Sequence, residues 1–296
     1  MTDGLLPVAS YADAPPPPPV GAPSQTQPPP RGKAPFRWLG YPGVSLLGVR
    51  RSVPSTIGIA ALAILLLFAA LAGVGLWSRS AEPSADVWAL AFLAAYLAGY
   101  GSWFLLLRLG VRASVPFRER VGLRPFDIAP GLIAAFVAMS AGLWFEILFM
   151  GMLVLIGIEV PRAPSVADIF PVTPVGIAVA IVVTCIAAPL AEEVLYRGVL
   201  FGGLRDRFGD WIAALVSSVA FAASHLNWYL LIPFTVLGML FAWITSQTRS
   251  VWPSVIAHAV FNLNAVILGY LYYLLYADVQ PAWVCGLREA IVVLAR

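Results

Sequence analysis

Seven long apolar runs constrain the fold of this 296-residue chain more than any other feature of its sequence. The hydrocarbon core of a bilayer is about 30 Å thick, so a helix needs about 20 apolar residues to cross it. Because backbone polar groups find no partners in lipid, an apolar run of this length is predicted to be a helix. The runs span residues 56–77, 87–107, 132–157, 174–199, 211–227, 229–247 and 252–275. We therefore predict an all-α fold, a polytopic transmembrane helical bundle of about seven spans.

The composition agrees with a membrane protein and excludes several other classes. Hydrophobic residues make up 60% of the chain and charged residues 11%, against about 25% charged residues in soluble domains. The net charge of +3 is small and the basic residues lie in short connections, so the sequence predicts no nucleic-acid partner. Neither Cys185 nor Cys285 belongs to a C-x-x-C pair, which excludes a zinc ribbon or a dithiol redox motif.

The chain divides into four predicted segments. Residues 1–43 are dense in proline with glycine, serine and glutamine, and we expect them to form a disordered cytoplasmic tail. Residues 44–170 contain the N-terminal transmembrane helices. Residues 171–275 contain a membrane core with the polar motifs described below, and residues 276–296 form a mixed C-terminal tail.

The arginines predict an orientation, since the cytoplasmic loops of membrane proteins carry an excess of basic residues. With the N-terminus in the cytoplasm, the loop 108–131 with five arginines and the connection 200–210 with two both lie inside. The opposite side then keeps Arg79 and Arg162, and the C-terminal tail lies outside. The prediction is a multi-pass protein of the cell membrane, surrounded by the lipid bilayer.

A small set of polar side chains stands inside these apolar runs. Ionisable residues are costly in a membrane helix, and a functional role is the default hypothesis for them. Both histidines of the chain lie in apolar runs, as do two adjacent glutamates. The candidate site residues are Glu192, Glu193, Arg197, His225, His258 and Asn262. Glu146, in the third run, has no partner spaced on its own helix and is left outside the site.

Helical spacing divides the two glutamates. Glu193 and Arg197 are four residues apart, so they share one helix face and are expected to pair. Glu192 is rotated by about 100° from Glu193, because an α-helix has 3.6 residues per turn. Glu192 therefore points to a different neighbour. His258 and Asn262 are also four residues apart, and one helix thus presents an imidazole and an amide to the same place.

Two kinds of site fit these residue types. In the first, Glu192 and His225 activate a water molecule, while His258 and Asn262 donate to the oxyanion that forms during amide hydrolysis. In the second, Glu192, His225 and His258 bind a divalent metal such as zinc, with water as a further ligand. Neither H-E-x-x-H nor G-x-S-x-G is present, which disfavours a zincin helix and a serine nucleophile on that elbow.

Three motifs in order resemble the CPBP family of intramembrane proteases, which includes the Rce-type CAAX prenyl proteases and the Abi proteins. They are EExxxR, present as "EEVLYRG" at 192–198, FxxxH, present as "FAASH" at 221–225, and HxxxN, present as "HAVFN" at 258–262. The resemblance covers about residues 170–270. Arg249 stands where the family has a glycine in the turn before the last motif.

The resemblance implies an all-helical membrane endopeptidase whose cavity opens to the cytosolic side. It implies that Glu192 and His225 activate water, that His258 and Asn262 stabilise the oxyanion, and that Glu193 and Arg197 support the site. The family is described both as metalloproteases and as glutamate-dependent proteases, so the metal stays an open alternative. The expected substrate is a membrane protein or peptide, and nothing in the sequence indicates a prenyl pocket.

Two other functional classes are left open by these residues. A non-catalytic membrane scaffold or immunity protein of the same family would keep the fold without the chemistry. A proton or metal transporter would use the same glutamates and histidines, but the sequence shows no internal repeat of the kind found in such proteins.

The depths of the site residues in the predicted helices do not match. Glu192 lies near the end of its run at 199, whereas His225 lies about 14 residues, or about 21 Å, into the fifth run. His258 lies one to two turns into the last run. We expect the start of the fifth run to dip into a cavity so that the three side chains meet.

Overall fold

The candidate polar residues lie on or beside one broken helix, which runs from residue 174 to residue 208. The computed structural model describes residues 53–109, 116–159 and 165–276. Most of the predicted tails 1–43 and 276–296 therefore lies outside the described residues. The described helices are α1 (Val53–Ala81), α2 (Ala85–Leu109), α3 (Phe117–Arg120), α4 (Ile128–Leu155), α5 (Val166–Ile169), α6 (Pro174–Ile181), η2 (Val182–Ala187), α7 (Ala188–Glu193), η3 (Val194–Phe201), α8 (Gly202–Ser224), α9 (Leu231–Thr248) and α10 (Trp252–Tyr276).

The all-α prediction is confirmed for the described residues, which contain helices and no strand. Six of the described segments are long and apolar enough to cross a membrane. They are Ile57–Ala81, Ala85–Leu105, Ile128–Leu155, Pro174–Arg205, Leu231–Thr248 and Trp252–Leu275. Each of these six corresponds to a predicted run, so the polytopic helical bundle follows from hydropathy alone.

The predicted run 211–227 is the one that does not form a span of its own. It lies in the second arm of α8, which follows a break at Gly209 (φ 78°, ψ 169°) and ends at Ser224. These 15 residues rise about 22 Å, which is less than the bilayer core. The boundary predicted at residue 199 was wrong, because helical structure continues from η3 into α8 and reaches Gly209.

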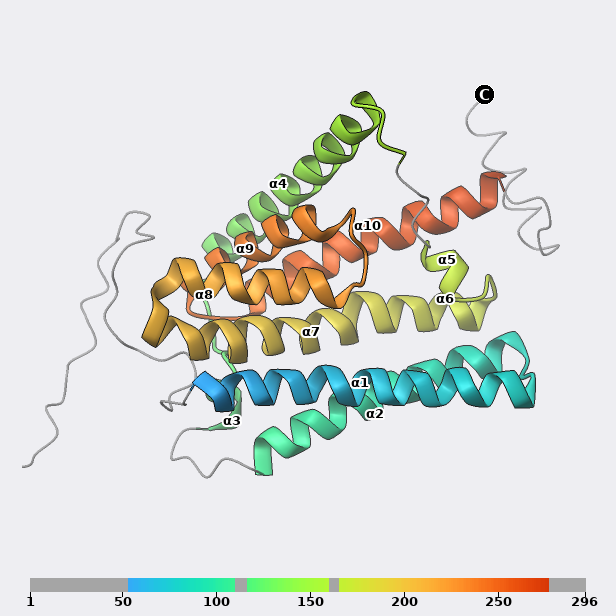
Figure 1. Cartoon of the computed structure of the whole chain (residues 1–296), viewed down its shortest axis with the longest axis horizontal. Helices are drawn as coiled ribbons and strands as arrows, with labels where there is room; N and C mark the ends of the chain where they lie inside the picture. Colours follow the sequence, from blue (N-terminus) through green and yellow to red (C-terminus); the bar gives the residue numbers. More distant parts are fainter. Residues whose placement is uncertain (1–52, 110–115, 160–164, 277–296) are drawn as a thin grey trace, which may run out of the picture. The chain divides into compact units, whose positions relative to one another are not determined.

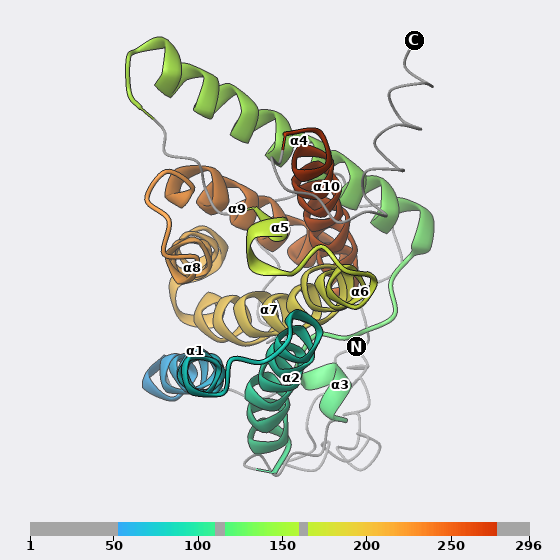
Figure 2. The same cartoon turned by 90° about the vertical axis from the view of Figure 1, so that its right-hand side faces the viewer.

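The chain reverses direction twice after the broken helix. At Gly209 the second arm of α8 turns back along η3, and after a turn at residues 225–230 α9 returns beside α8. Figure 1 shows these antiparallel arms above the long helix labelled α7. In Figures 1 and 2, α6 to α10 lie between the α1–α2 pair on one side and α4 on the other.

A connecting loop from the N-terminal half holds two elements of the core together. The Val251 N–H, at the turn before α10, donates to the carbonyl of Gly122 at 2.8 Å. The neighbouring carbonyl of Val121 lies so close to Gly198 that a β-carbon on Gly198 would come within 2.3 Å of it. Gly198 thus permits the loop to pack directly on η3, one residue after Arg197.

Candidate active site

The centre of the candidate site is a buried ion pair on the broken helix. Arg197 Nη1 donates to Glu193 Oε1 at 2.9 Å, and both side chains are fully buried. His258 Nδ1 lies 3.0 Å from the same carboxylate oxygen, with 3% of the side chain exposed. The predicted pairing of Glu193 with Arg197 is therefore present, and the pair has His258 as a third member.

Three groups from α8 and α9 surround the Arg197 guanidinium. Arg197 Nη2 donates to the carbonyl of Gly238 at 3.1 Å. The guanidinium carbon lies 4.6 Å from the ring centroid of Phe221 and 5.3 Å from that of Phe241. Aromatic faces attract a cation, and the attraction grows when water is absent. The arginine is therefore held by one carboxylate, one carbonyl and two ring faces.

Glu192 lies on another face of the helix, as its rotation from Glu193 predicts. Its side chain is 15% exposed, and its Oε2 lies 4.0 Å from His258 Nε2. Its Oε1 accepts a hydrogen bond of 3.4 Å from the hydroxyl of Tyr96, which belongs to α2. Arg197 does not pair with Glu192, so this carboxylate is the more accessible of the two and is not neutralised by the arginine.

His258 connects the two carboxylates through its two ring nitrogens. A carboxylate oxygen accepts hydrogen bonds, so the contact with Glu193 assigns the proton to Nδ1 of His258. Nε2 then faces Glu192. The helix α10 thereby places one imidazole between a supporting carboxylate and a more exposed one.

His225 is placed differently from the other candidate residues. It follows the last residue of α8, and its Nδ1 lies 2.9 Å from the carbonyl of Phe221. A carbonyl only accepts, so Nδ1 carries the proton and Nε2 is the nitrogen that is left for other chemistry. The residue is exposed, and among the described residues no hydrogen bond or ion pair joins it to Glu192 or His258.

The ring of Phe221 brings the two histidines to one region. Its centroid lies 4.9 Å from that of His225 and 5.5 Å from that of His258, so the imidazoles are separated by no more than these distances combined.

The two arms around Gly209 explain why Glu192 and His225 lie at similar depths in the bundle. Glu192 lies 17 residues before Gly209 and His225 lies 16 residues after it. The expected dip is therefore replaced by a longer helix and a hairpin with nearly equal arms.

Asn262 contacts the broken helix one turn beyond His258. Its Nδ2 donates to the carbonyl of Thr184 at 2.7 Å. An amide nitrogen carries two N–H groups, so one donor remains after this bond is made. His258 and Asn262 both turn toward the helix of Glu192, in agreement with their predicted common face.

The predicted metal ligands do not form a metal-binding group in this geometry. Over the described ranges, no set of three or more His, Cys, Asp or Glu residues lies close enough to hold an ion. Among the described residues His225 has no ion pair with Glu192, whereas Nε2 of each histidine stays available as a ligand, because Nδ1 is the nitrogen that contacts an oxygen atom. The Glu192–His225–His258 ligand set therefore stays a prediction, and no step of the chemistry below depends on a metal.

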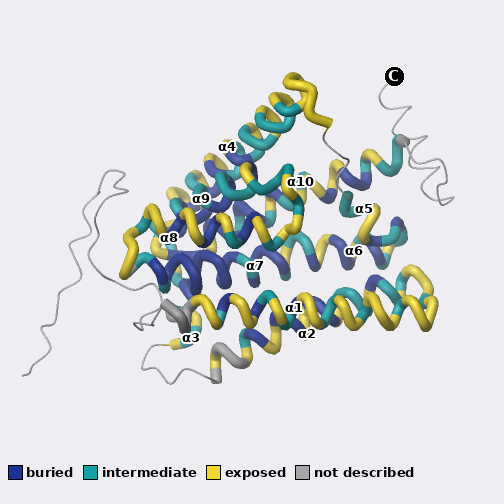
Figure 3. Tube along the Cα trace, viewed as in Figure 1, coloured by how far each residue is buried: buried dark blue, intermediate teal, exposed yellow. Residues whose placement is uncertain are grey.

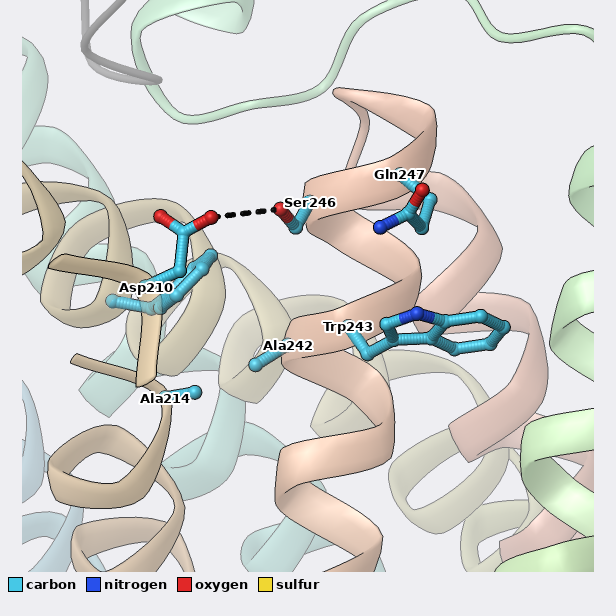
Figure 4. A pocket seen from close by; sticks show the side chains of 7 residues that line it. Asp210, Ala214, Ala242, Trp243, Ser246 and Gln247 are labelled. Atoms are coloured by element: carbon cyan, nitrogen blue, oxygen red, sulfur yellow. Dashed lines mark hydrogen bonds between the residues drawn. The ribbon is translucent and has the colours of Figure 1, made fainter. Parts of the chain in front are cut away.

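A small hollow lies at the Gly209 end of the hairpin, apart from the Glu192 contacts. Figure 4 shows Asp210, Ser246, Trp243 and Gln247 among the residues that line it. Asp210 accepts from Ser246 at 3.4 Å and pairs with Arg205 at 2.9 Å. These bonds close the hairpin at its base, and the hollow contains none of the candidate site residues.

The sequence did not indicate the roles of two aromatic residues, Tyr96 and Phe221, which lie outside the set of candidate site residues. Tyr96 reaches Glu192 from α2, in a part of the chain where no motif was recognised. Phe221 was noted only for its spacing to His225, yet its ring contacts Arg197 and both histidines. A tyrosine in an apolar run is the one signal in the sequence that points to Tyr96. Glu146 has no hydrogen bond or ion pair with any described residue and stays outside the site.

Comparisons with known proteins agree with the motifs. A family model described as "Type II CAAX prenyl endopeptidase Rce1-like" matches residues 174–264, which include all three motifs. The chain is 30% identical over 113 residues to "Putative membrane peptidase YdiL" of Bacillus subtilis (strain 168), a match that covers 38% of this chain and 45% of the relative. No solved structure matches the chain.

A second relative covers a similar part of the chain. It is "UPF0177 protein YxdF" of Lactococcus lactis subsp. lactis (strain IL1403), 38% identical over 80 residues, or 26% of this chain and 43% of that protein. The chain thus spans less than half the length of these relatives. The six apolar helices and these matches support a multi-pass membrane protein. Residues 174–264 of this chain are therefore similar to the Rce1-like type II CAAX prenyl endopeptidases, in agreement with the resemblance of the three motifs to the CPBP family.

Proposed function

We propose that this protein hydrolyses a peptide bond of a membrane-associated substrate, with Glu192 as the base that activates water. The observation that carries the proposal is the division between the two glutamates. Glu193 is fully buried and bound by Arg197 and His258, whereas Glu192 is partly exposed and, among the described residues, has no cationic partner other than the His258 ring at 4.0 Å. A carboxylate free of a salt bridge is available to accept a proton.

The proposed reaction begins when Glu192 removes a proton from a water molecule. The water oxygen attacks the carbonyl carbon of the scissile bond, and negative charge develops on the carbonyl oxygen. Nearby N–H donors stabilise that charge. When the carbon–nitrogen bond breaks, the proton held by Glu192 passes to the leaving nitrogen, and the carboxylate is regenerated.

The other motif residues have proposed roles around this step. Nε2 of His225 helps to hold the water, because Nδ1 is engaged by the Phe221 carbonyl. The second N–H of Asn262 is a proposed oxyanion donor, and Nε2 of His258 is another once it has taken up a proton, because Nδ1–H is already bonded to Glu193. Glu193 and Arg197 keep His258 in place from the buried side.

The substrate is proposed to be a membrane protein or peptide that reaches the site from the lipid phase or from the cytosolic end. The cytosolic end is taken as the one where Gly209 and the turn before α10 lie, because arginines of α3, of the start of α8 and of the turns beside them lie at this end. These are Arg118, Arg124, Arg205, Arg207 and Arg249. The basic excess supports an inward-facing position for this end.

The test compares membrane peptides from cells that produce the wild-type protein, the Glu192→Gln variant or the Glu146→Gln variant. Glu146→Gln is the matched control, since it neutralises another acid of a membrane helix that has no place in the site. We expect cleavage products that disappear with Glu192→Gln and persist with Glu146→Gln. Equal products from wild-type and Glu192→Gln cells would remove Glu192 as the base and favour the non-catalytic scaffold.

Metal dependence stays a prediction with its own measurement. Purified wild-type protein is assayed for bound zinc and for cleavage after treatment with a chelator. The geometry described above leads us to expect less than one bound zinc per chain and cleavage that survives chelation. A stoichiometric metal that is lost from Glu192→Gln would restore the metal-ligand alternative.

A further inference from the structure

The break in the long helix before Glu192 leaves one main-chain carbonyl without its regular partner. The N–H of Ala188 donates to the carbonyl of Val183, five residues back, instead of four as in an α-helix. In this register the N–H of residue 189 would bond to the carbonyl of Thr184. Residue 189 is a proline and has no N–H. The Thr184 carbonyl is therefore open to a donor from elsewhere.

The donor comes from another helix. Asn262 on α10 donates its Nδ2 to this carbonyl at 2.7 Å, which is a short bond for an amide donor. An unpaired carbonyl inside an apolar membrane helix is costly, and side chains of neighbouring helices commonly satisfy carbonyls that proline has freed. The bond thus follows from the proline, and it also fixes the plane of the Asn262 amide.

A second bond from α10 lies on the far side of the proline. His258, one turn before Asn262, contacts Glu193 at 3.0 Å. The two side chains of α10 therefore bind the broken helix at two points, five residues before Pro189 and four residues after it. Pro189 itself is buried between these points.

We propose that Pro189 is a positioning residue of the site. By withholding an N–H, it keeps the Thr184 carbonyl available, and this carbonyl orients the Asn262 amide and holds α10 against the helix of Glu192. The catalytic part of this inference rests on the proposed peptidase function. The structural part, a bond between α10 and Thr184 that depends on Pro189, does not.

The structural part predicts an interaction between two substitutions. In Asn262→Ala the Thr184 carbonyl loses its donor, and we expect the Tm of the purified protein in detergent to fall by about 2–6 °C. In Pro189→Ala the new N–H supplies a donor within the helix. The same Asn262→Ala change should then lower the Tm by less than half as much. An equal fall in both backgrounds would overturn the proposal.

Two matched controls separate this interaction from general effects. Asn264 lies on the same helix, and its amide donates to the carbonyl of Val260 at 2.8 Å, within α10. Pro174 is the first residue of α6, where a helix needs no N–H. We expect Asn264→Ala with Pro189→Ala, and Asn262→Ala with Pro174→Ala, to be additive. If Asn262→Ala alone cannot be purified, its recovery with Pro189→Ala supports the proposal, and failure in both backgrounds overturns it.

Activity provides a second readout, on a peptide identified by the Glu192 comparison. Pro189→Ala should lower kcat by at least about tenfold with little change in KM, because the amide loses its fixed orientation. Its Tm should not fall, since the helix gains a hydrogen bond. A lower Tm together with a lower kcat would indicate only a damaged fold and would contradict the positioning role. If no cleavage is found at all, the peptidase function fails, while the Tm cycle still decides the bond.

Discussion

The first span and the fourth span differ in a way that hydropathy does not predict. Ile57–Ala81 has a window of mean hydropathy 2.8 with 11% of its residues buried, whereas Pro174–Arg205 has 2.3 with 44% buried. The more apolar helix is the more exposed one. In lipid there is little hydrophobic gain from burying an apolar side chain, so close packing and polar contacts decide which helix lies inside.

The two spans also bury different kinds of residue. α1 exposes Leu65 at 65% and Leu76 at 68%, and its buried positions include Ala60 and Ala63. By contrast every residue of η3, Val194–Phe201, is buried, including Arg197. Figure 3 shows the same contrast along the trace, with α1 largely exposed and the region of α7 largely buried. Four substitutions, from the largest expected effect to the smallest, test whether this contrast governs stability.

The largest effect is expected from Arg197→Met, which leaves the buried Glu193 carboxylate without its cation. Removing one partner of a buried ion pair costs about 3–5 kcal/mol, and we expect a loss of this size in thermal or chemical unfolding in detergent. The double variant Glu193→Gln/Arg197→Met should recover part of the loss. Arg79→Met, at the exposed end of α1, is the control and should change stability little. Equal losses of stability in Arg197→Met and Arg79→Met would contradict the contrast between the two spans.

Gly238→Ala comes next, because its new methyl group has no room. A β-carbon there would lie 2.8 Å from Ser218 Cβ and 3.0 Å from Arg197 Nη2. Overpacking of this kind costs about 1–3 kcal/mol. Gly73 in α1 has nothing within 4 Å of its β-carbon position, so Gly73→Ala should be neutral or stabilising by up to about 1 kcal/mol. Paired Tm measurements check both, and a neutral Gly238→Ala would contradict the close packing.

An intermediate effect is expected from Phe221→Leu, which removes the ring against Arg197 and the two histidines. The loss of the cation–π contact and of packing should destabilise the protein by about 1–2 kcal/mol. Phe68→Leu in α1, where the ring is 40% exposed, should stay within about 0.5 kcal/mol. Unfolding of both variants under one condition gives the comparison. If Phe68→Leu has the larger effect, the ring of Phe221 does not hold the cluster.

The smallest effect is expected from Tyr96→Phe, which removes the single described hydrogen bond from α2 to Glu192. The bond is long at 3.4 Å, so the expected loss of stability is below about 1 kcal/mol. The cleavage rate should fall a few-fold because the Glu192 carboxylate loses a donor. Tyr270→Phe is matched in burial, at 8% against 7% exposed, and its hydroxyl has no described partner. A Tyr270→Phe variant that loses cleavage as strongly as Tyr96→Phe would refute this role for Tyr96.

Hydropathy predicted the six described spans, because each span must form its own backbone hydrogen bonds within the lipid, whichever helices surround it. It failed at residues 199–227, where helical structure continues through the charged segment 200–208 and the run 211–227 forms a returning arm instead of a span. The reversal depends on the backbone at Gly209, and its single glycine gave no signal that a hairpin rather than a loop would form there.

Spacing on one helix predicted the pairing of Glu193 with Arg197, since four residues apart in a helix means neighbours on one face. The sequence by itself therefore determined the six spans, the Glu193–Arg197 pair and the set of polar candidate residues. Only the tertiary structure decided that His258 contacts Glu193 as well as facing Glu192, that Asn262 binds the Thr184 carbonyl, and that Tyr96 approaches from α2. Those contacts join residues that are far apart in the chain, and their geometry depends on how whole helices pack.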